Sequence, residues 1–226
     1  ASPPLVMTFD GSDPTGGAGL QADLLTFAAL GCHPLTVVTA LTVQDTAGVE
    51  AIQAVEADWV TDQARRLLED VPVAAFKIGF VGNLHNIGAI ASIVADYPDI
   101  PLVLDPVMAS GRGDDMANDD MIAAMRELLV PQTTVLTPNS LEARRLASGD
   151  DEDPDMALPL ADCASRLLGL GCEYVLITGT HEGTPQVINT LFGEGGDVQA
   201  EVWDRLPGSY HGSGCTLASA IAAFLA

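Results

Sequence analysis

Residues 5–31 read LVMTFDGSDPTGGAGLQADLLTFAALG, and this stretch decides the fold class of the chain. Leu5–Phe9 is a short apolar run of the kind that forms a buried strand. Leu20–Leu30 has the apolar spacing of a helix and is followed by Gly31, a residue that tolerates the left-handed backbone found after helix C-termini. Thr36–Val43 then predicts a second strand. The chain therefore begins with a strand–helix–strand unit.

The same alternation continues toward the C-terminus. The pattern predicts strands at Ala75–Ile78, Leu102–Leu104, Thr134–Leu136 and Tyr174–Ile177. It predicts helices at Asp58–Glu69, Asn86–Ala95, Asp119–Leu129, near Ser140, at Leu160–Leu168 and at Gly214–Leu225. Val187–Phe192 and Val198–Trp203 are predicted to form a hairpin. Gly149–Pro159 is acidic and is predicted to be a surface loop. Strands that alternate with helices predict an α/β fold, here one domain over residues 1–226 with a mainly parallel central sheet between two helical layers.

Composition narrows the function classes. The chain has 226 residues, of which 48% are hydrophobic and 5% aromatic, so its core is aliphatic. Nine basic and 31 acidic residues give a net charge of -22, and Lys77 is the only lysine. Such a surface repels nucleic acid and anionic membranes. Four scattered cysteines without a CxxC pair, and no basic leader or long apolar run, predict a reduced, cytoplasmic protein that neither enters a membrane nor binds nucleic acid.

Polar residues or glycines follow each predicted strand. They are residues 10–13, 44–45, 79, 105–106, 137–139 and 178–179. The carboxyl ends of parallel strands meet at one edge of a sheet, and open α/β folds bind their ligands there. Any one of these residues could serve a turn alone, but their shared edge predicts a functional cleft.

Two glycine-rich segments stand out. Gly11–Gly19 matches neither the P-loop nor the dinucleotide fingerprint, so a tight turn and a binding loop both remain open. The segment Gly212-Ser213-Gly214-Cys215-Thr216 precedes and opens the last predicted helix. Backbone N–H groups at a helix N-terminus favour an anion, such as a phosphoryl group in transfer. The same dipole is expected to stabilise a Cys215 thiolate, whereas the alternative is a buried structural cysteine.

Three further strand-end residues have two interpretations each. Asn139 can cap a helix and Glu142 can complete a capping box, which the spacing alone favours, although both could instead hold water around Mg²⁺. Asp105 could contact metal-bound water or groups near the phosphates of a ligand. Alternatively, it only begins a turn. The amide of Gln44 both donates and accepts, so it could recognise a ring nitrogen beside an amine.

Together these stretches resemble the hydroxymethylpyrimidine/phosphomethylpyrimidine kinases of thiamine biosynthesis, in the ribokinase-like superfamily. The resemblance runs from Val6 to Ala226. It rests on GSDPTGGAGLQAD (11–23), ALTVQDTAGV (40–49), KIG (77–79), LDPVM (104–108), LTPNSLEA (136–143) and HGSGCTLASAIA (211–222).

The resemblance implies two successive phosphoryl transfers from ATP with Mg²⁺, first to 4-amino-5-hydroxymethyl-2-methylpyrimidine and then to its monophosphate. It places the pyrimidine among Gly11, Ala18, Thr42, Gln44, Phe80 and Val107. It assigns the anion hole to Gly212, Ser213 and Gly214, with Cys215 in the position of the catalytic base. Mg²⁺ is assigned to Glu142, and the nucleotide phosphates to Asp105, Asn139, Thr178 and Gly179. The implied partners are two small molecules and, in a homodimer, a second copy of the chain.

The chain departs from the family pattern at several positions. Asp10 replaces a small residue, Phe80 a methionine and Thr42 an aliphatic residue. Residues 178–181 read Thr-Gly-Thr-His in place of Lys-Gly-Gly-His, and the family continues with helical sequence beyond Ala226, which predicts a truncated C-terminal end. Pyridoxal kinase and a non-catalytic pyrimidine-binding protein remain alternatives. A sugar kinase is disfavoured because its base would be an aspartate at position 215.

Overall fold

A nine-stranded sheet forms the centre of the computed structural model, which describes residues 2–46, 48–110, 113, 115–149, 158–208 and 210–226. The strands are β1 (Leu5–Ser12), β2 (His33–Gln44), β3 (Val49–Ala54), β4 (Ala75–Ile78), β5 (Leu102–Leu104), β6 (Val135–Leu136), β7 (Tyr174–Ile177), β8 (Gln186–Gly193) and β9 (Gly196–Asp204). Their order is β3-β2-β1-β4-β5-β6-β7-β8-β9, parallel from β2 to β7 and antiparallel at both edges. The predicted α/β fold with a mainly parallel sheet is confirmed.

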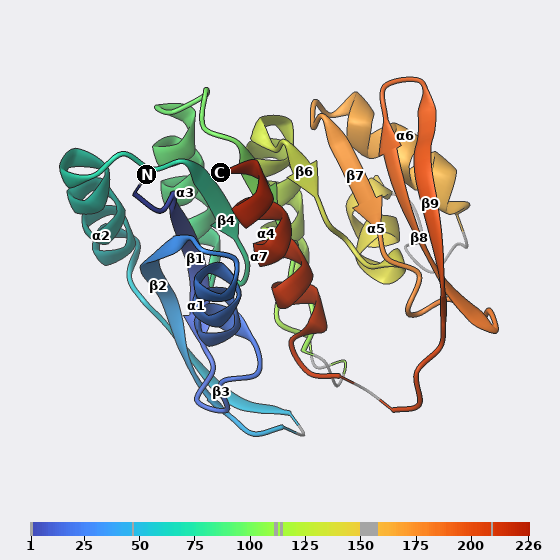
Figure 1. Ribbon diagram of the computed structural model, residues 1–226, viewed down its shortest axis with the longest axis horizontal. Helices are drawn as coiled ribbons and strands as arrows, with labels where there is room; N and C mark the ends of the chain where they lie inside the picture. Colours follow the sequence, from blue (N-terminus) through green and yellow to red (C-terminus); the bar gives the residue numbers. More distant parts are fainter. Residues whose placement is uncertain (1, 47, 111–112, 114, 150–157, 209) are drawn as a thin grey trace.

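Helices cover both faces of this sheet (Figure 1). The helices are α1 (Gly19–Ala29), α2 (Ala57–Asp70), α3 (Leu84–Ala95), α4 (Asp119–Ala124), α5 (Ser140–Ala147), α6 (Leu160–Gly169) and α7 (Ser213–Leu225). The first and last helices, α1 and α7, pack against each other on one face. The other helices lie on the opposite face, so the protein has the predicted three layers. Among the residues described, no helix is long and apolar enough to cross a membrane.

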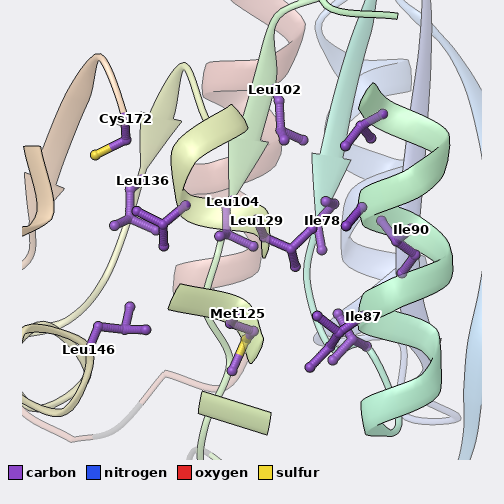
Figure 2. Packing of buried hydrophobic residues seen from close by; sticks show 14 of the residues in the cluster. Ile78, Ile87, Ile90, Leu102, Leu104, Met125, Leu129, Leu136, Leu146 and Cys172 are labelled. Carbon is purple, nitrogen blue, oxygen red and sulfur yellow. The ribbon is translucent and has the colours of Figure 1, made fainter. Parts of the chain in front are cut away.

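The alternation of side chains along β1 supplies both halves of the core. Met7 and Phe9 join the large cluster beneath α2 and α3, whereas Val6 joins the smaller cluster beneath α1 and α7. Figure 2 shows the large cluster, in which Ile87 and Ile90 of α3 point toward sheet residues. Because successive strand residues face opposite sides, Thr8 and Asp10 are directed with Val6 toward α1 and α7.

Two local predictions differ from the structure. The strand Val49–Ala54 was not predicted, because three of its side chains are exposed polar or small residues on an edge strand and give no apolar alternation. The predicted helix Asp119–Leu129 is α-helical only to Ala124 and continues as a π-turn over Met125–Leu129 and a 3-10 turn over Val130–Gln132. Pro131 has no backbone N–H to donate, which favours a break in the helix.

Two other predictions concern glycine and the acidic loop. Gly31 has φ +80° and follows Leu30, the C-cap of α1, as a helix-terminating glycine should. Most of the predicted acidic loop Gly149–Pro159 lies outside the described residues.

Candidate active site

The two glycine-rich segments from opposite ends of the chain meet at the carboxyl edge of the sheet. Gly212 precedes α7 with φ +81°, and a Cβ atom there would overlap the carbonyl oxygen of Gly17. A Cβ atom on Gly17 would in turn lie 2.8 Å from the His211 ring. Glycine is needed at Gly212 both for its backbone angle and for this close approach. The loop between β1 and α1 therefore packs directly against the N-terminus of α7.

Asp13 organises this loop. Its carboxylate accepts hydrogen bonds from the backbone N–H groups of Thr15 and Ala18, both at 2.8 Å, and its Oδ2 lies 2.9 Å from His211 Nε2. Burial acts to raise the pKa of Asp13, but hydrogen bonds from Gln44, Thr15 and His211 lower that pKa to about 2. Asp13 thus stays ionised and joins Gln44, at the end of β2, to the glycine-rich loop.

Three of the residues assigned to the pyrimidine lie close to this loop. A Cβ atom on Gly11 would be 3.2 Å from Phe80 Cδ1, so the Phe80 ring covers Gly11. Thr42 Oγ1 donates to the carbonyl oxygen of Ser12 at 2.8 Å, which joins β2 to the end of β1. Val107 is half-buried and follows β5, two strands along the sheet from Gly11.

A buried charge cluster lies between the sheet and the α1–α7 layer. Lys77 is fully buried, and its Nζ lies 2.6 Å from Asp10 Oδ2 and 2.9 Å from Asp23 Oδ1. Asp23 also accepts hydrogen bonds from the hydroxyls of Thr8 and Ser219. Two carboxyl groups thus share one ammonium group and connect β1, β4, α1 and α7. Sequence analysis did not predict this cluster, although a lone lysine inside a buried strand was a signal for it.

Burial shifts the ionisation of the groups around Lys77. It raises the pKa of Asp10 to about 7 and that of Asp105 to about 6, with Asp23 adding to both shifts and Lys77 opposing them. Hydrogen bonding with the Cys215 thiol lowers the pKa of Asp105. Burial also raises the pKa of Cys215 well above its usual value; Lys77 opposes this shift, and the neighbouring carboxylates add to it. The expectation that the helix dipole favours a thiolate is therefore wrong, because burial favours the thiol.

Asn139 and Glu142 form the predicted capping box at the start of α5. Asn139 Oδ1 accepts from the backbone N–H groups of Leu141 and Glu142, and Glu142 Oε2 accepts from the Asn139 N–H at 2.8 Å. Burial and the nearby Asp105 charge raise the pKa of Glu142 to about 8, against the opposing backbone hydrogen bonds from Asn139 and Met108.

These carboxyl groups fit a Mg²⁺ ion held largely by water and phosphate. In the described part of the chain, no three His, Cys, Asp or Glu side chains form a metal-binding group. Mg²⁺ does not need such a cage, because it retains waters and binds through one or two carboxylates plus phosphates. Burial is the main cause of the raised pKa values of Asp105 and Glu142, and the charge of a neighbouring carboxylate adds to each shift. A divalent cation would favour the ionised form of both groups.

Thr178 and Gly179 lie beside the capping box. Thr178 forms a parallel bridge with Asn139, so the end of β7 adjoins the start of α5. The turn that follows is held by Arg205, whose guanidinium donates to the carbonyl oxygen of Thr180 at 2.7 Å. Arg205 was not singled out from the sequence, yet it places a cation next to the turn where the family pattern has a lysine.

A cavity of about 360 Å³ lies elsewhere, between the C-terminal ends of α5 and α6. Its lining includes Arg126, Leu146 and Arg166 and none of the residues predicted for the site. The chemistry-bearing residues instead gather at the carboxyl edge of the sheet.

Comparisons with known proteins identify the family of the chain. The family model described as phosphomethylpyrimidine kinase matches residues 13–226. The hydroxymethylpyrimidine/phosphomethylpyrimidine kinase of Mycobacterium tuberculosis is 40% identical over 227 residues, covering 100% of this chain and 82% of that protein. The crystal structure of phosphomethylpyrimidine kinase from Clostridium difficile has a TM-score of 0.81 and 33% identity, covering 98% of this chain and 90% of that one. Pyridoxal kinase from Staphylococcus aureus in complex with ADP has a TM-score of 0.85 and 28% identity, covering 100% and 81%. The fold is ribokinase-like, and the chain belongs to the phosphomethylpyrimidine kinase family.

Proposed function

We propose that this kinase transfers a phosphoryl group from ATP to 4-amino-5-hydroxymethyl-2-methylpyrimidine, and then a second one to the resulting monophosphate, in thiamine biosynthesis. The observation that carries the proposal is the packing of the β1–α1 loop against the N-terminus of α7. This packing supports a heteroaromatic pocket next to a site for a phosphoryl group. Relatives that bear the name of this activity match nearly the whole chain.

The pyrimidine ring is assigned to the pocket formed by the loop and the neighbouring strand ends. Phe80 and Val107 supply apolar contacts, and Gly11 allows the ring to approach the backbone closely. The side-chain amide of Gln44 can donate to a ring nitrogen and accept from the exocyclic amine. Thr42 and Ala18 complete the pocket.

The phosphoryl group is assigned to the N-terminus of α7. Among the described residues, no side chain caps this helix, and the Ser213 N–H makes only a long hydrogen bond of 3.4 Å to the Tyr210 carbonyl oxygen, which favours an anion at this end. The N–H groups that follow Gly212, those of Ser213 and Gly214 among them, form the proposed anion hole. Thr178 and Gly179 lie on the nucleotide side of the same edge.

The proton of the acceptor hydroxyl is assigned a path through Cys215 to Asp105. Because Cys215 is a thiol that donates to Asp105, it can accept the hydroxyl proton at Sγ while its own proton passes to the carboxylate. With a pKa of about 6, Asp105 is ionised near neutral pH. The second acceptor is a phosphate monoester whose second pKa is about 6, so it is already mostly dianionic and needs no base.

Mg²⁺, when bound, neutralises charge on the transferring phosphate groups. Glu142 and Asn139 would hold it through water, and Asp105 would face the phosphates. The capping box keeps Asn139 and Glu142 rigid at the start of α5, so their polar atoms present a fixed surface to this water shell.

A second candidate function is pyridoxal phosphorylation, which the structural similarity to pyridoxal kinases supports. Hydroxymethylpyrimidine, its monophosphate and pyridoxal should be incubated separately with the chain and Mg·ATP, and the products separated chromatographically. We expect both pyrimidines to be phosphorylated with kcat/KM at least tenfold above that of pyridoxal. Preferential use of pyridoxal would favour the second function. Pyrimidine binding without turnover would indicate a non-catalytic binding protein.

A further inference from the structure

Asp10 lies at an irregularity in the sheet. The register between β1 and β2 shifts between Asp10, which pairs with Val38, and Gly11, which pairs with Ala40. Asp10 Oδ1 accepts from the backbone N–H of Gly11 at 2.7 Å and from that of Phe80 at 2.9 Å. One carboxylate oxygen therefore joins the end of β1 to the segment that follows β4. A bulge of this kind often redirects residues next to a site.

The second oxygen of Asp10 is fixed just as firmly. It lies 2.6 Å from Lys77 Nζ, and the side chain of Asp10 is almost fully buried. Gly79 passes beneath this ion pair, and a Cβ atom there would overlap the Asp10 carboxylate and lie 2.7 Å from Nζ. The position of the carboxylate is thus determined from several sides.

Phe80 is the residue that this arrangement holds in place. Its backbone N–H donates to Asp10, and its carbonyl oxygen accepts from the hydroxyl of Thr39. Its ring covers Gly11, and the residue is only 4% exposed. Since the backbone of Phe80 is held from both sides, these two bonds fix how closely its ring approaches Gly11.

We propose that Asp10 is a positioning residue that determines substrate specificity by fixing Phe80 over Gly11. The space left beside Gly11 then accommodates a flat pyrimidine with small substituents in preference to the more heavily substituted pyridoxal ring. This inference rests on the proposed function, in which the acceptor ring binds beside these residues. A small residue at position 10 would leave the Gly11 and Phe80 N–H groups without this acceptor, and Phe80 could shift.

The decisive comparison is between Asp10→Ala and Asp10→Asn. Both variants remove the ion pair with Lys77. The asparagine retains an oxygen that can accept from both N–H groups, whereas alanine removes it, so the two variants differ in this acceptor. For Asp10→Ala we expect KM for hydroxymethylpyrimidine to rise about tenfold with a smaller change in kcat, and the kcat/KM ratio of pyrimidine to pyridoxal to fall about tenfold or more. Asp10→Asn should stay within about threefold of wild type on both measures. Asp96→Asn, which breaks a surface ion pair with Arg65, is the matched control and should change neither.

A double-mutant cycle with Phe80→Leu tests whether Asp10 acts through Phe80. If it does, Asp10→Ala should change the selectivity ratio less than twofold in the Phe80→Leu background. Additive effects of the two substitutions on the selectivity ratio would overturn the proposal. A selectivity ratio as low in Asp10→Asn as in Asp10→Ala would also overturn it, because the charge of Asp10 and not its hydrogen bonds would then determine selectivity. Should Asp10→Ala fail to fold, an unchanged selectivity ratio in Phe80→Leu would also overturn it.

Calorimetric binding of hydroxymethylpyrimidine separates this inference from the proposed function. If the wild-type chain binds hydroxymethylpyrimidine without turnover, and Asp10→Ala weakens this binding about tenfold, the kinase proposal is refuted and the role of Asp10 is supported. Wild-type turnover with an unchanged selectivity ratio in Asp10→Ala would refute only the role of Asp10. A wild-type chain that binds neither acceptor would overturn both.

Discussion

Lys77→Met tests the buried charge cluster most severely. The substitution preserves an unbranched apolar stem but removes the ammonium group, which lies 2.6 Å from Asp10 and 2.9 Å from Asp23. All three side chains are almost completely buried, so water cannot replace the lost partner. Breaking a buried ion pair costs about 3–5 kcal/mol. At roughly 2–4 °C per kcal/mol for a chain of this size, the midpoint of thermal unfolding should fall by about 6–20 °C.

The assay is unfolding in urea and on heating, at about pH 5.5 and about pH 8. Without the lysine, which lowers the pKa of Asp10, that pKa rises further above its ordinary value, so the folded chain binds more protons than the unfolded chain. The loss of stability should therefore be larger at about pH 8. Arg65→Met is the control, because it removes only an exposed ion pair worth about 0–1 kcal/mol. A Lys77→Met chain no less stable than Arg65→Met would refute the reasoning.

Four further results are expected. In single-turnover assays, Cys215→Ala should slow the first phosphoryl transfer by about 100-fold or more and the second by less than tenfold, because only the first acceptor must lose a proton. Equal losses in both transfers would show that Cys215 is not on the proton path. Glu142→Gln should lower both transfers by roughly 10- to 100-fold and raise the Mg²⁺ concentration needed for half-maximal rate; an unchanged Mg²⁺ dependence would leave Glu142 as a cap alone. Gly212→Ala should abolish turnover and destabilise the fold, since φ is +81° and the new Cβ overlaps a facing carbonyl; a near-normal crystal structure and rate would contradict this. The pKa values of Asp10, Asp105 and Glu142 are raised to about 7, 6 and 8, so the folded chain binds more protons than the unfolded chain. The unfolding free energy measured without Mg²⁺ should therefore fall as pH rises from about 5 to about 8. A rise in stability over that range would contradict the pKa shifts.

The strand–helix alternation was predictable because each element carries a local pattern. The parallel strands show short apolar runs and the helices show amphipathic spacing, so the sheet and its carboxyl edge followed from the sequence. The edge strand Val49–Ala54 was not predictable in this way, since its exposed side chains are under no requirement to be apolar.

The site was predictable where glycines and caps have local signatures. The Asn139–Glu142 capping box is such a case, and so is the glycine-rich start of α7. The contact of Lys77 with Asp10 and Asp23 joins residues 67 and 54 positions apart, and no local pattern reports it. For the same reason, the sequence predicted a Cys215 thiolate, whereas burial among carboxylates favours the thiol.

The most direct test of the central claim is phosphorus NMR of the reaction with the pyrimidine monophosphate as acceptor and Mg·ATP as donor. The proposed function predicts loss of the monoester signal and the appearance of two coupled signals from the pyrimidine diphosphate, as ADP accumulates. A monoester signal that persists at full intensity, with folded protein and intact ATP, would contradict the claim that this chain performs the second transfer.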